Sequence, residues 1–238
     1  MPTVKITSPI SESDFRLQEA YKSLRSNLQF CGPDFKVIAF TSCMPNEGKS
    51  SVSLQVAISL AELGKKVLLV DADLRKSVLM RKLKVTSKGV RGLSHYLSGQ
   101  YPLDEVLNAT NIENLSIIFA GPVPPNPAEL LGSTLFQNLV TAFRSVYDYV
   151  IIDTPPLGSV IDSAVVAQNC DGAVMVIGAN TISYRFAQEI RDQLEKSNCK
   201  ILGVVLNKVN VKSRRYYGKY YGKYYGGYGD YYGTAEGR

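Results

Sequence analysis

The chain has 238 residues, of which 45% are hydrophobic and 20% charged, a composition typical of one well-buried globular domain. No window offers the roughly 18 uncharged apolar residues that a membrane-spanning helix needs, and the first residues are polar, so we expect neither a membrane anchor nor a signal peptide. The four cysteines stand far apart without a Cys-x-x-Cys pair, which argues against a disulfide framework and a zinc site.

The net charge of +6 is concentrated at one end of the chain. Residues 212–238 contain six basic and two acidic side chains, a net charge of +4, whereas the other 211 residues carry only +2. A binding surface for nucleic acid requires clustered positive charge, so we expect none on the body of the protein.

The chain begins with an amphipathic helix, predicted over residues 12–30. Leu17, Tyr21, Leu24 and Leu28 recur at spacings of four, three and four, which forms one apolar stripe. Short apolar segments then alternate with helical ones. The predicted strands are 36–41, 66–70, 115–119, 150–152, 173–177 and 201–206. The predicted helices are 49–63, 78–83, 92–98, 103–108, 128–146, 161–168 and 183–196.

The predicted strands are nearly all apolar, as strands buried on both faces are. Strands and helices that alternate along the chain favour an α/β fold with a doubly wound, mostly parallel sheet.

A phosphate-binding loop is predicted between the first strand and the next helix. The segment from Cys43 to Ser50 ends in Gly48-Lys49-Ser50, the pattern in which backbone N–H groups hold phosphates, the lysine reaches the β- and γ-phosphates, and the hydroxyl binds Mg²⁺. Cys43 replaces the first glycine of the standard pattern. The residues expected to contact the nucleotide are Met44, Pro45, Asn46, Glu47, Gly48, Lys49, Ser50 and Ser51.

Three aspartates follow two other predicted strands. Asp71 and Asp73 end one strand and are spaced by two, so their side chains point to the same side, and Asp153 ends another. Ligands of open parallel sheets bind at the carboxyl ends of the strands, where the phosphate loop also lies. The sequence therefore predicts a magnesium–ATP site of the P-loop NTPase type.

These motifs together resemble those of a known family. The phosphate loop, the Asp71-Ala-Asp73-Leu-Arg75 segment and Asp153-Thr-Pro-Pro are similar to those of the bacterial tyrosine kinases. Within that family they resemble the cytoplasmic kinase of capsule and exopolysaccharide operons in Gram-positive bacteria, the CpsD/CapB type. The resemblance extends from the first helix to the C-terminal segment, and it counts Arg75 among the catalytic residues.

The resemblance implies a role for each polar residue of the site. Lys49 would bind phosphate, Ser50 and Asp153 would hold Mg²⁺, and Asp73 would assist the metal. Asp71 would act beside the attacking tyrosine hydroxyl as base or orienter.

The first helix carries part of a further family motif. The family has Glu-x-x-Arg-x-x-Arg there, a motif that builds a ring of subunits, and the matching residues are Glu19, Lys22 and Arg25, with lysine in place of the middle arginine. Helical geometry places the three on a face about 130° from the apolar stripe, where they are expected to be free to meet a neighbour. The alternative is a solvated ion pair at i,i+3.

The last 27 residues differ from the rest in composition. They hold nine of the fifteen tyrosines, separated by glycines and lysines, and no aliphatic residue larger than alanine. Such a segment is predicted to be disordered when alone. The expected phosphorylation sites are Tyr216, Tyr217, Tyr220, Tyr221, Tyr224, Tyr225, Tyr228, Tyr231 and Tyr232. We thus expect an oligomerisation segment (1–30), a P-loop kinase domain (31–211) and an autophosphorylation tail (212–238).

The expected function is transfer of the ATP γ-phosphoryl group to tyrosines, first those of the tail and between subunits. From the resemblance we also expect regulation of polysaccharide polymerisation and export. It implies a membrane adaptor of the polysaccharide co-polymerase type, a homo-oligomeric ring with an octamer as the candidate size, and a tyrosine phosphatase. The kinase would then be a cytoplasmic protein recruited to the inner face of the membrane.

The sequence also allows two other functions. The fold and motifs also occur in positioning ATPases of the ParA/MinD type, which carry a second lysine early in the loop, where this chain has Met44. Alternatively, the aromatic and basic tail of an ATP-binding protein could stack on single-stranded nucleic acid.

Overall fold

The computed structural model describes residues 3–6, 15–85 and 89–210, and the tyrosines of the tail lie outside these ranges. The chain divides into two units, Met1–Asn207 and Lys208–Arg238. The strands, all in the first unit, are β1 (Thr3–Val4), β2 (Val37–Ser42), β3 (Val67–Asp71), β4 (Leu107–Thr110), β5 (Leu115–Ile118), β6 (Tyr149–Asp153), β7 (Gly172–Gly178) and β8 (Ile201–Asn207). The helices are α1 (Phe15–Phe30), α2 (Lys49–Glu62), α3 (Leu79–Lys82), α4 (Leu93–Leu97), α5 (Leu103–Val106), α6 (Pro127–Leu131), α7 (Thr134–Val146), α8 (Asp162–Ala167) and α9 (Tyr184–Glu195).

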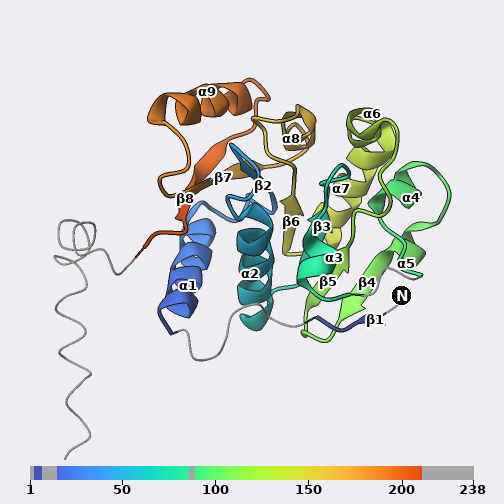
Figure 1. The fold of residues 1–238 in the computed structure, drawn as a ribbon. Coiled ribbons are helices and arrows are strands. Elements are labelled where there is room, and N and C mark those ends of the chain that lie inside the picture. The colour runs from blue at the N-terminus through green and yellow to red at the C-terminus, as the bar shows by residue number, and fades with distance from the viewer. Residues whose placement is uncertain (1–2, 7–14, 86–88, 211–238) are drawn as a thin grey trace, which may run out of the picture. The chain divides into compact units, whose positions relative to one another are not determined.

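The strands form one sheet in the order β1-β4-β5-β3-β6-β2-β7-β8. All neighbouring pairs are parallel except β4 and β5, which are antiparallel. The α/β fold with a mostly parallel sheet is thereby confirmed (Figure 1).

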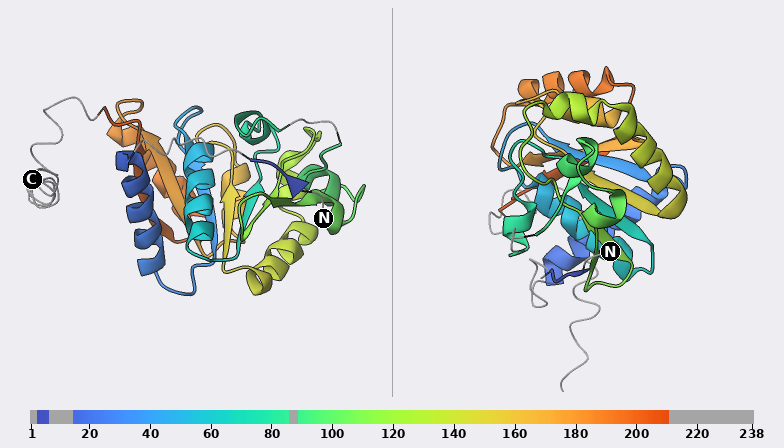
Figure 2. Two further views of the ribbon diagram at one scale, coloured as in Figure 1. Left: turned by 90° about the horizontal axis from the view of Figure 1, so that it is seen from below. Right: turned by 90° about the vertical axis from the view of Figure 1, so that its right-hand side faces the viewer.

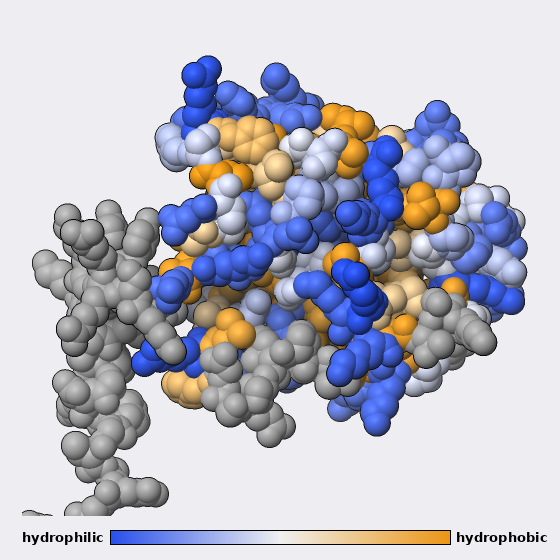
Figure 3. Space-filling view, viewed as in Figure 1, coloured by the Kyte–Doolittle hydropathy of each residue, from blue (hydrophilic) through white to orange (hydrophobic). Residues whose placement is uncertain are grey.

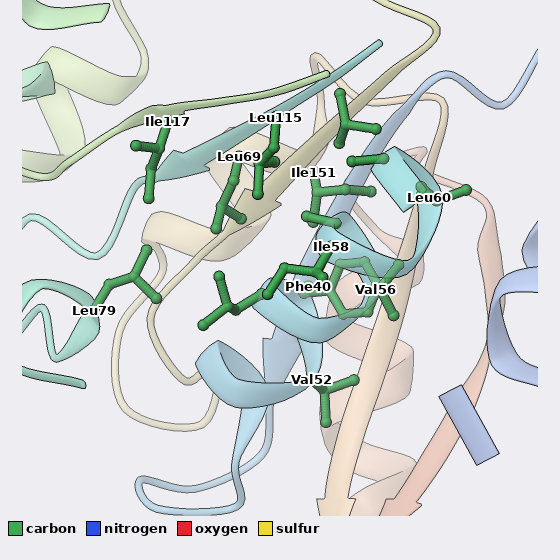
Figure 4. Close-up of a cluster of buried hydrophobic side chains, with 14 of the residues drawn as sticks. Phe40, Val52, Val56, Ile58, Leu60, Leu69, Leu79, Leu115, Ile117 and Ile151 are labelled. Carbon is green, nitrogen blue, oxygen red and sulfur yellow. The ribbon is translucent and has the colours of Figure 1, made fainter. Parts of the chain in front are cut away.

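Helices cover both faces of the sheet, with α1, α2 and α3 on one face and α4, α6, α7, α8 and α9 on the other (Figures 1 and 2). Successive residues of a strand point to opposite faces, so both faces need apolar side chains. In β3, Leu69 packs beneath α2 while Leu68 packs beneath α7. Figure 4 shows the first of these cores, where Phe40 of β2 and Ile151 of β6 meet Val56 of α2.

Besides the short strand β1, which the sequence did not predict, the structure differs from the sequence-based elements in two places. Residues 103–108 form only a short helix before β4 continues the chain as a strand, because β4 completes its hydrogen bonds with β5. The single helix expected over 128–146 is two helices, α6 and α7. Ser133 begins the second one, since its side-chain oxygen accepts a hydrogen bond from Phe136 N at 3.3 Å.

The register of the central strands places the expected site residues together. Asp71 at the end of β3 is the direct partner of Asp153 at the end of β6, and β6 lies beside β2, which leads into the phosphate loop. Three neighbouring strands thus deliver their last residues to one edge of the sheet.

The outer surface seen in Figure 3 is largely polar, with separate small apolar patches. Within the described ranges, no helix is both long and apolar enough to cross a membrane.

Candidate active site

The phosphate loop links the end of β2 to the start of α2. Gly48 precedes the helix with φ 98°, a left-handed conformation that favours glycine, and its carbonyl accepts bonds from Ser51 N and Val52 N at 3.0 Å each. Met44, Pro45 and Asn46 form the exposed part of the loop. The backbone thus turns into the helix in the manner that a phosphate cradle requires.

Glu47 braces this loop from within. Its carboxylate is buried and accepts hydrogen bonds from Met44 N at 2.7 Å, Gly178 N at 3.1 Å and Thr181 Oγ1 at 2.9 Å. From the sequence, Glu47 was predicted only as a nucleotide contact. An acidic residue in an anion-binding loop must turn away from the phosphates, and that reasoning would have pointed to a structural role.

Asn207, at the end of β8, supports the same loop. Its side-chain Nδ2 donates to the carbonyl oxygen of Glu47 at 2.9 Å, and a Cβ on Gly48 would lie 2.1 Å from that nitrogen. Gly48 is therefore required both by its φ and by this close approach. Asn207 was not among the predicted site residues, although it lies at the carboxyl end of a strand, where ligands of such sheets bind.

Cys43, in place of the first glycine, is completely buried. Burial and the nearby charge of Glu47 raise the pKa of its thiol to about 12. The thiol is therefore protonated at neutral pH and serves as a small apolar residue beneath the loop.

Lys49 lies among the three predicted carboxylates. Its Nζ is 3.2 Å from Asp73 Oδ2 and 3.5 Å from Asp153 Oδ1, and it also contacts Ser50 Oγ at 3.3 Å. Burial alone lowers the pKa of Lys49, but the charges of Asp153, Asp73 and Asp71 outweigh it and leave the pKa raised. The ammonium group of Lys49 is thus charged, and it lies where the phosphate oxygens of a bound nucleotide would also contact it.

Asp71, at the end of β3, is a completely buried carboxyl. Burial, followed by repulsion from Asp153, raises its pKa to about 7. Ser77 Oγ and Asp73 N donate to its two oxygens, the latter at 3.2 Å. A carboxyl with a pKa near 7 is suited to accept a proton at physiological pH.

The oxygen atoms near Lys49 fit a magnesium ion bound together with phosphate. Burial raises the pKa of Asp153, which the Lys49 charge and a hydrogen bond with Ser50 partly offset. Mg²⁺ prefers such hydroxyl and carboxylate oxygens and takes its remaining ligands from phosphates and water. Within the described ranges, no three His, Cys, Asp or Glu side chains could hold a metal by themselves.

Arg75 is directed to another partner. Its guanidinium binds Asp162 in a bidentate pair, with Nε–Oδ2 at 2.8 Å and Nη2–Oδ1 at 3.0 Å, and Asp162 is completely buried at the start of α8. Arg75 thus ties the loop after β3 to α8. Ser51, the last expected nucleotide contact, accepts a hydrogen bond from Lys82 of α3.

The assembly residues of α1 do not share one free face. Glu19 and Lys22 form an exposed ion pair at 2.7 Å. Arg25 instead donates from Nη1 to Ser59 O at 2.9 Å and to Ser59 Oγ at 3.2 Å, on α2 of its own chain. The expectation that Arg25 is free is therefore wrong, because the long side chain reaches around α1 to the neighbouring helix.

Comparison with known proteins defines the class and then the family. A protein-family model described as an AAA domain matches residues 35–201, so the chain is a nucleotide-binding protein of the P-loop class. The tyrosine-protein kinase CpsD of Streptococcus agalactiae is 42% identical over 209 residues, which cover 86% of this chain and 91% of the relative. The chain belongs to the bacterial tyrosine kinases of the CpsD/CapB type, and it is a tyrosine-protein kinase.

Solved structures agree with this assignment. The chimerical protein CapA2B2 superimposes with a TM-score of 0.79 at 30% identity, covering 87% of this chain and 93% of that chain. The septum site-determining protein MinD of Pyrococcus horikoshii, a complex with Mg-ADP, gives a TM-score of 0.62 at 24% identity and covers 72% and 69% of the two chains. The second likeness shows the shared fold alone.

Proposed function

We propose that this kinase transfers the γ-phosphoryl group of ATP to tyrosine hydroxyls of residues 212–238, between copies of the chain. The observation that carries the proposal is Lys49 held among three carboxylates, one of which, Asp71, has a pKa of about 7. The tail supplies nine tyrosines as acceptors.

In this mechanism the loop backbone and Lys49 bind the phosphates of ATP and oppose the charge that develops during transfer. The tyrosine oxygen attacks the γ-phosphorus, the bond from the γ-phosphorus to the ADP oxygen breaks, and ADP leaves. Asp71 accepts the proton from the tyrosine hydroxyl. Ser50, Asp153 and Asp73 would hold Mg²⁺, which supplies charge neutralisation on the phosphates.

Arg75 has a supporting role in this proposal. The Arg75–Asp162 pair holds the loop that carries Asp71 and Asp73 against α8, so Arg75 acts through the position of those carboxylates. Removing Arg75 would leave Asp162 buried without a partner, and the loop would lose its anchor.

We further propose that the chain works in capsule or exopolysaccharide synthesis, together with a membrane adaptor and a phosphatase that removes the phosphates. Copies of the chain would form a homo-oligomeric ring, built partly on α1. The family membership supports the pathway. The similarity to CapA2B2 supports the adaptor, since a chimera joins parts of two proteins. The likeness is extensive, because this chain covers 93% of the chimera. The segment boundaries proposed for these roles are 1–30, 31–211 and 212–238.

Two variants test transfer between copies. One chain carries Lys49→Met and keeps its tail tyrosines, and the other is active but has all nine tail tyrosines changed to phenylalanine. Mixed with ATP and Mg²⁺, with adaptor added if the isolated chain is inactive, the Lys49→Met chain should gain phosphotyrosine at a rate that rises with the concentration of the other chain.

The matched control is Tyr184→Phe, which removes an exposed tyrosine of the body. It should leave total phosphotyrosine nearly unchanged, whereas the nine-phenylalanine variant alone should lose most of it. If the Lys49→Met chain in the mixture gains no phosphotyrosine, although wild type alone is fully phosphorylated, each copy phosphorylates itself.

A further inference from the structure

Lys49 contacts the same side chains that the proposed function assigns to Mg²⁺. Its Nζ lies 3.3 Å from Ser50 Oγ, 3.2 Å from Asp73 Oδ2 and 3.5 Å from Asp153 Oδ1. Each of these three oxygens belongs to a residue named above as a metal ligand. The ammonium group and a divalent cation would therefore use one set of oxygens.

These contacts lie inside the protein. Asp73 and Asp153 are 6% and 1% exposed, and Lys49 and Ser50 are buried beside them. Asp71, the direct strand partner of Asp153, is a further buried carboxyl. Buried carboxylates need a cation held against them, because little water is present to stabilise their charge. Lys49 supplies such a cation from within the chain.

Two cations cannot both be held well by these oxygens. Like charges repel strongly in a buried site, where water and salt screen them little. In addition, Mg²⁺ gives up its bound water reluctantly and takes part of its ligands from phosphates. A metal ion that arrived alone would have to displace Lys49 without offering the displaced ammonium group another partner, and an unpaired buried charge is costly.

A bound nucleotide changes this balance. Lys49 is the first residue of α2, so its backbone is fixed at the end of the phosphate loop, whereas its flexible side chain can turn. Phosphate oxygens at the loop offer the ammonium group new acceptors. When Lys49 turns toward them, the oxygens of Ser50, Asp73 and Asp153 lose their cation. The nucleotide therefore makes these oxygens available to a metal ion and leaves them in need of one.

We propose that Lys49 is an internal counter-ion that keeps Mg²⁺ out of the site until nucleotide phosphates draw the ammonium group away. Nucleotide then binds first or together with its metal, and the metal alone does not precede it. The inference rests on the proposed function, which names the metal-binding residues, and it adds a regulation of that same site. It also gives Lys49 a role before phosphoryl transfer begins.

The test measures binding of Mn²⁺, which prefers the same oxygen ligands as Mg²⁺ and is detected directly by electron paramagnetic resonance. The protein is the full chain at pH 8, without nucleotide. Lys49→Met should bind Mn²⁺ at least about tenfold more tightly than wild type, because its carboxylates then lack the ammonium group. Equal affinities of the two proteins for Mn²⁺ would overturn the proposal.

The matched control is Lys76→Met, which removes the same charge from an exposed lysine in the loop after β3. Lys76 contacts Asp73 through its backbone N–H, 3.0 Å from Oδ1, and methionine keeps that group. The control thus changes the net charge near the site without changing the contacts of Lys49, and it should bind Mn²⁺ as wild type does. An equal gain in both variants would mean that net charge controls metal binding, which contradicts the proposal.

A double variant locates the bound ion. Adding Asp73→Asn to Lys49→Met removes the charge of one of the shared ligands, so the double variant should bind Mn²⁺ at least about fivefold more weakly than Lys49→Met. If both bind Mn²⁺ equally tightly, the ion lies elsewhere and the proposal fails.

Thermal unfolding provides a second readout in case Lys49→Met folds poorly. In wild type, ADP with a chelator should raise Tm, whereas about 5 mM Mg²⁺ should raise it only when ADP is also present, because a ligand stabilises only a protein that binds it. In Lys49→Met, Mg²⁺ alone should raise Tm by several degrees. A rise in the wild-type Tm with Mg²⁺ alone would overturn the proposal.

These measurements require no phosphoryl transfer, so they separate the two proposals. If wild type shows the expected order of ADP and metal but phosphorylates no tyrosine when the adaptor is added, the proposed function is wrong and the role of Lys49 as a counter-ion is supported. If wild type phosphorylates its tyrosines and also binds Mn²⁺ without nucleotide as tightly as Lys49→Met does, only the present inference is wrong.

Discussion

The centre of the sheet and the first helix present their charges in opposite ways. Around Lys49 the carboxylates of Asp71 and Asp153 are 0% and 1% exposed, and each has bonded partners. On α1, the Glu19 and Lys22 side chains are 47% and 54% exposed and contact each other. Buried charges persist only where their partners are fixed, whereas an exposed pair is stabilised little in the isolated chain. The fixed, buried charges at the centre of the sheet are therefore suited to catalysis, whereas the exposed charges of α1 are suited to contact another molecule.

The largest expected effect comes from removing the central cation. Lys49→Met should lower the rate of tyrosine phosphorylation by about 10³-fold, because transfer depends on charge stabilisation at the phosphates. It should also destabilise the nucleotide-free protein at pH 8, since three carboxylates lose their common partner. Phosphotyrosine immunoblots and urea unfolding measure the two effects. Normal phosphorylation by the purified variant would remove Lys49 from the mechanism.

A smaller effect is expected from the brace of the phosphate loop. In Glu47→Gln the amide nitrogen would face N–H donors where the carboxylate accepted three bonds, so at least one is lost. We expect KM for ATP to rise about 10- to 100-fold with a smaller change in kcat. Glu62→Gln, an exposed change at the end of α2, is the control. An unchanged KM would show that the loop keeps its shape without the brace.

The sequence predicted the centre better than the margins, for physical reasons. Short apolar strands and the order of the motifs determine which carboxyl ends meet, so the proximity of Asp71, Asp153 and Lys49 followed from the pattern alone. The Arg75–Asp162 pair and the Glu47 bonds join segments far apart in the chain, and no local pattern encodes them. Likewise, the stripe of α1 predicted a helix but not that Arg25 would reach Ser59 on α2.

The pKa of Asp71 predicts how stability depends on pH in the absence of Mg²⁺ and nucleotide. Burial raises that pKa from 3.8 to about 7 in the folded state, so between these values the folded protein retains a proton that the unfolded chain releases. The stabilisation is complete below pH 4 and is lost as pH rises through 7. Urea unfolding at pH 5 and pH 8 should therefore show a loss of roughly 3 kcal/mol in wild type that is much smaller in Asp71→Asn, where Asp153 alone keeps a raised pKa. The same loss in both proteins would place the titration at another group.

The smallest effects should come from α1, where they separate assembly from folding. Removing the exposed Glu19–Lys22 pair by changing both to alanine should alter the free energy of unfolding by at most about 0.5 kcal/mol. Arg25→Ala removes two hydrogen bonds to Ser59 and should cost about 1 kcal/mol. If the pair meets a neighbouring copy, the double variant should have a lower mass in light scattering than Arg25→Ala at equal protein concentration, with the adaptor present. The contrast is informative because the less stable variant is then the better assembled one. If the double variant and wild type have equal masses, Glu19 and Lys22 form only a solvated ion pair and contact no other copy. If only Arg25→Ala has a lower mass, assembly depends on how α1 packs against α2.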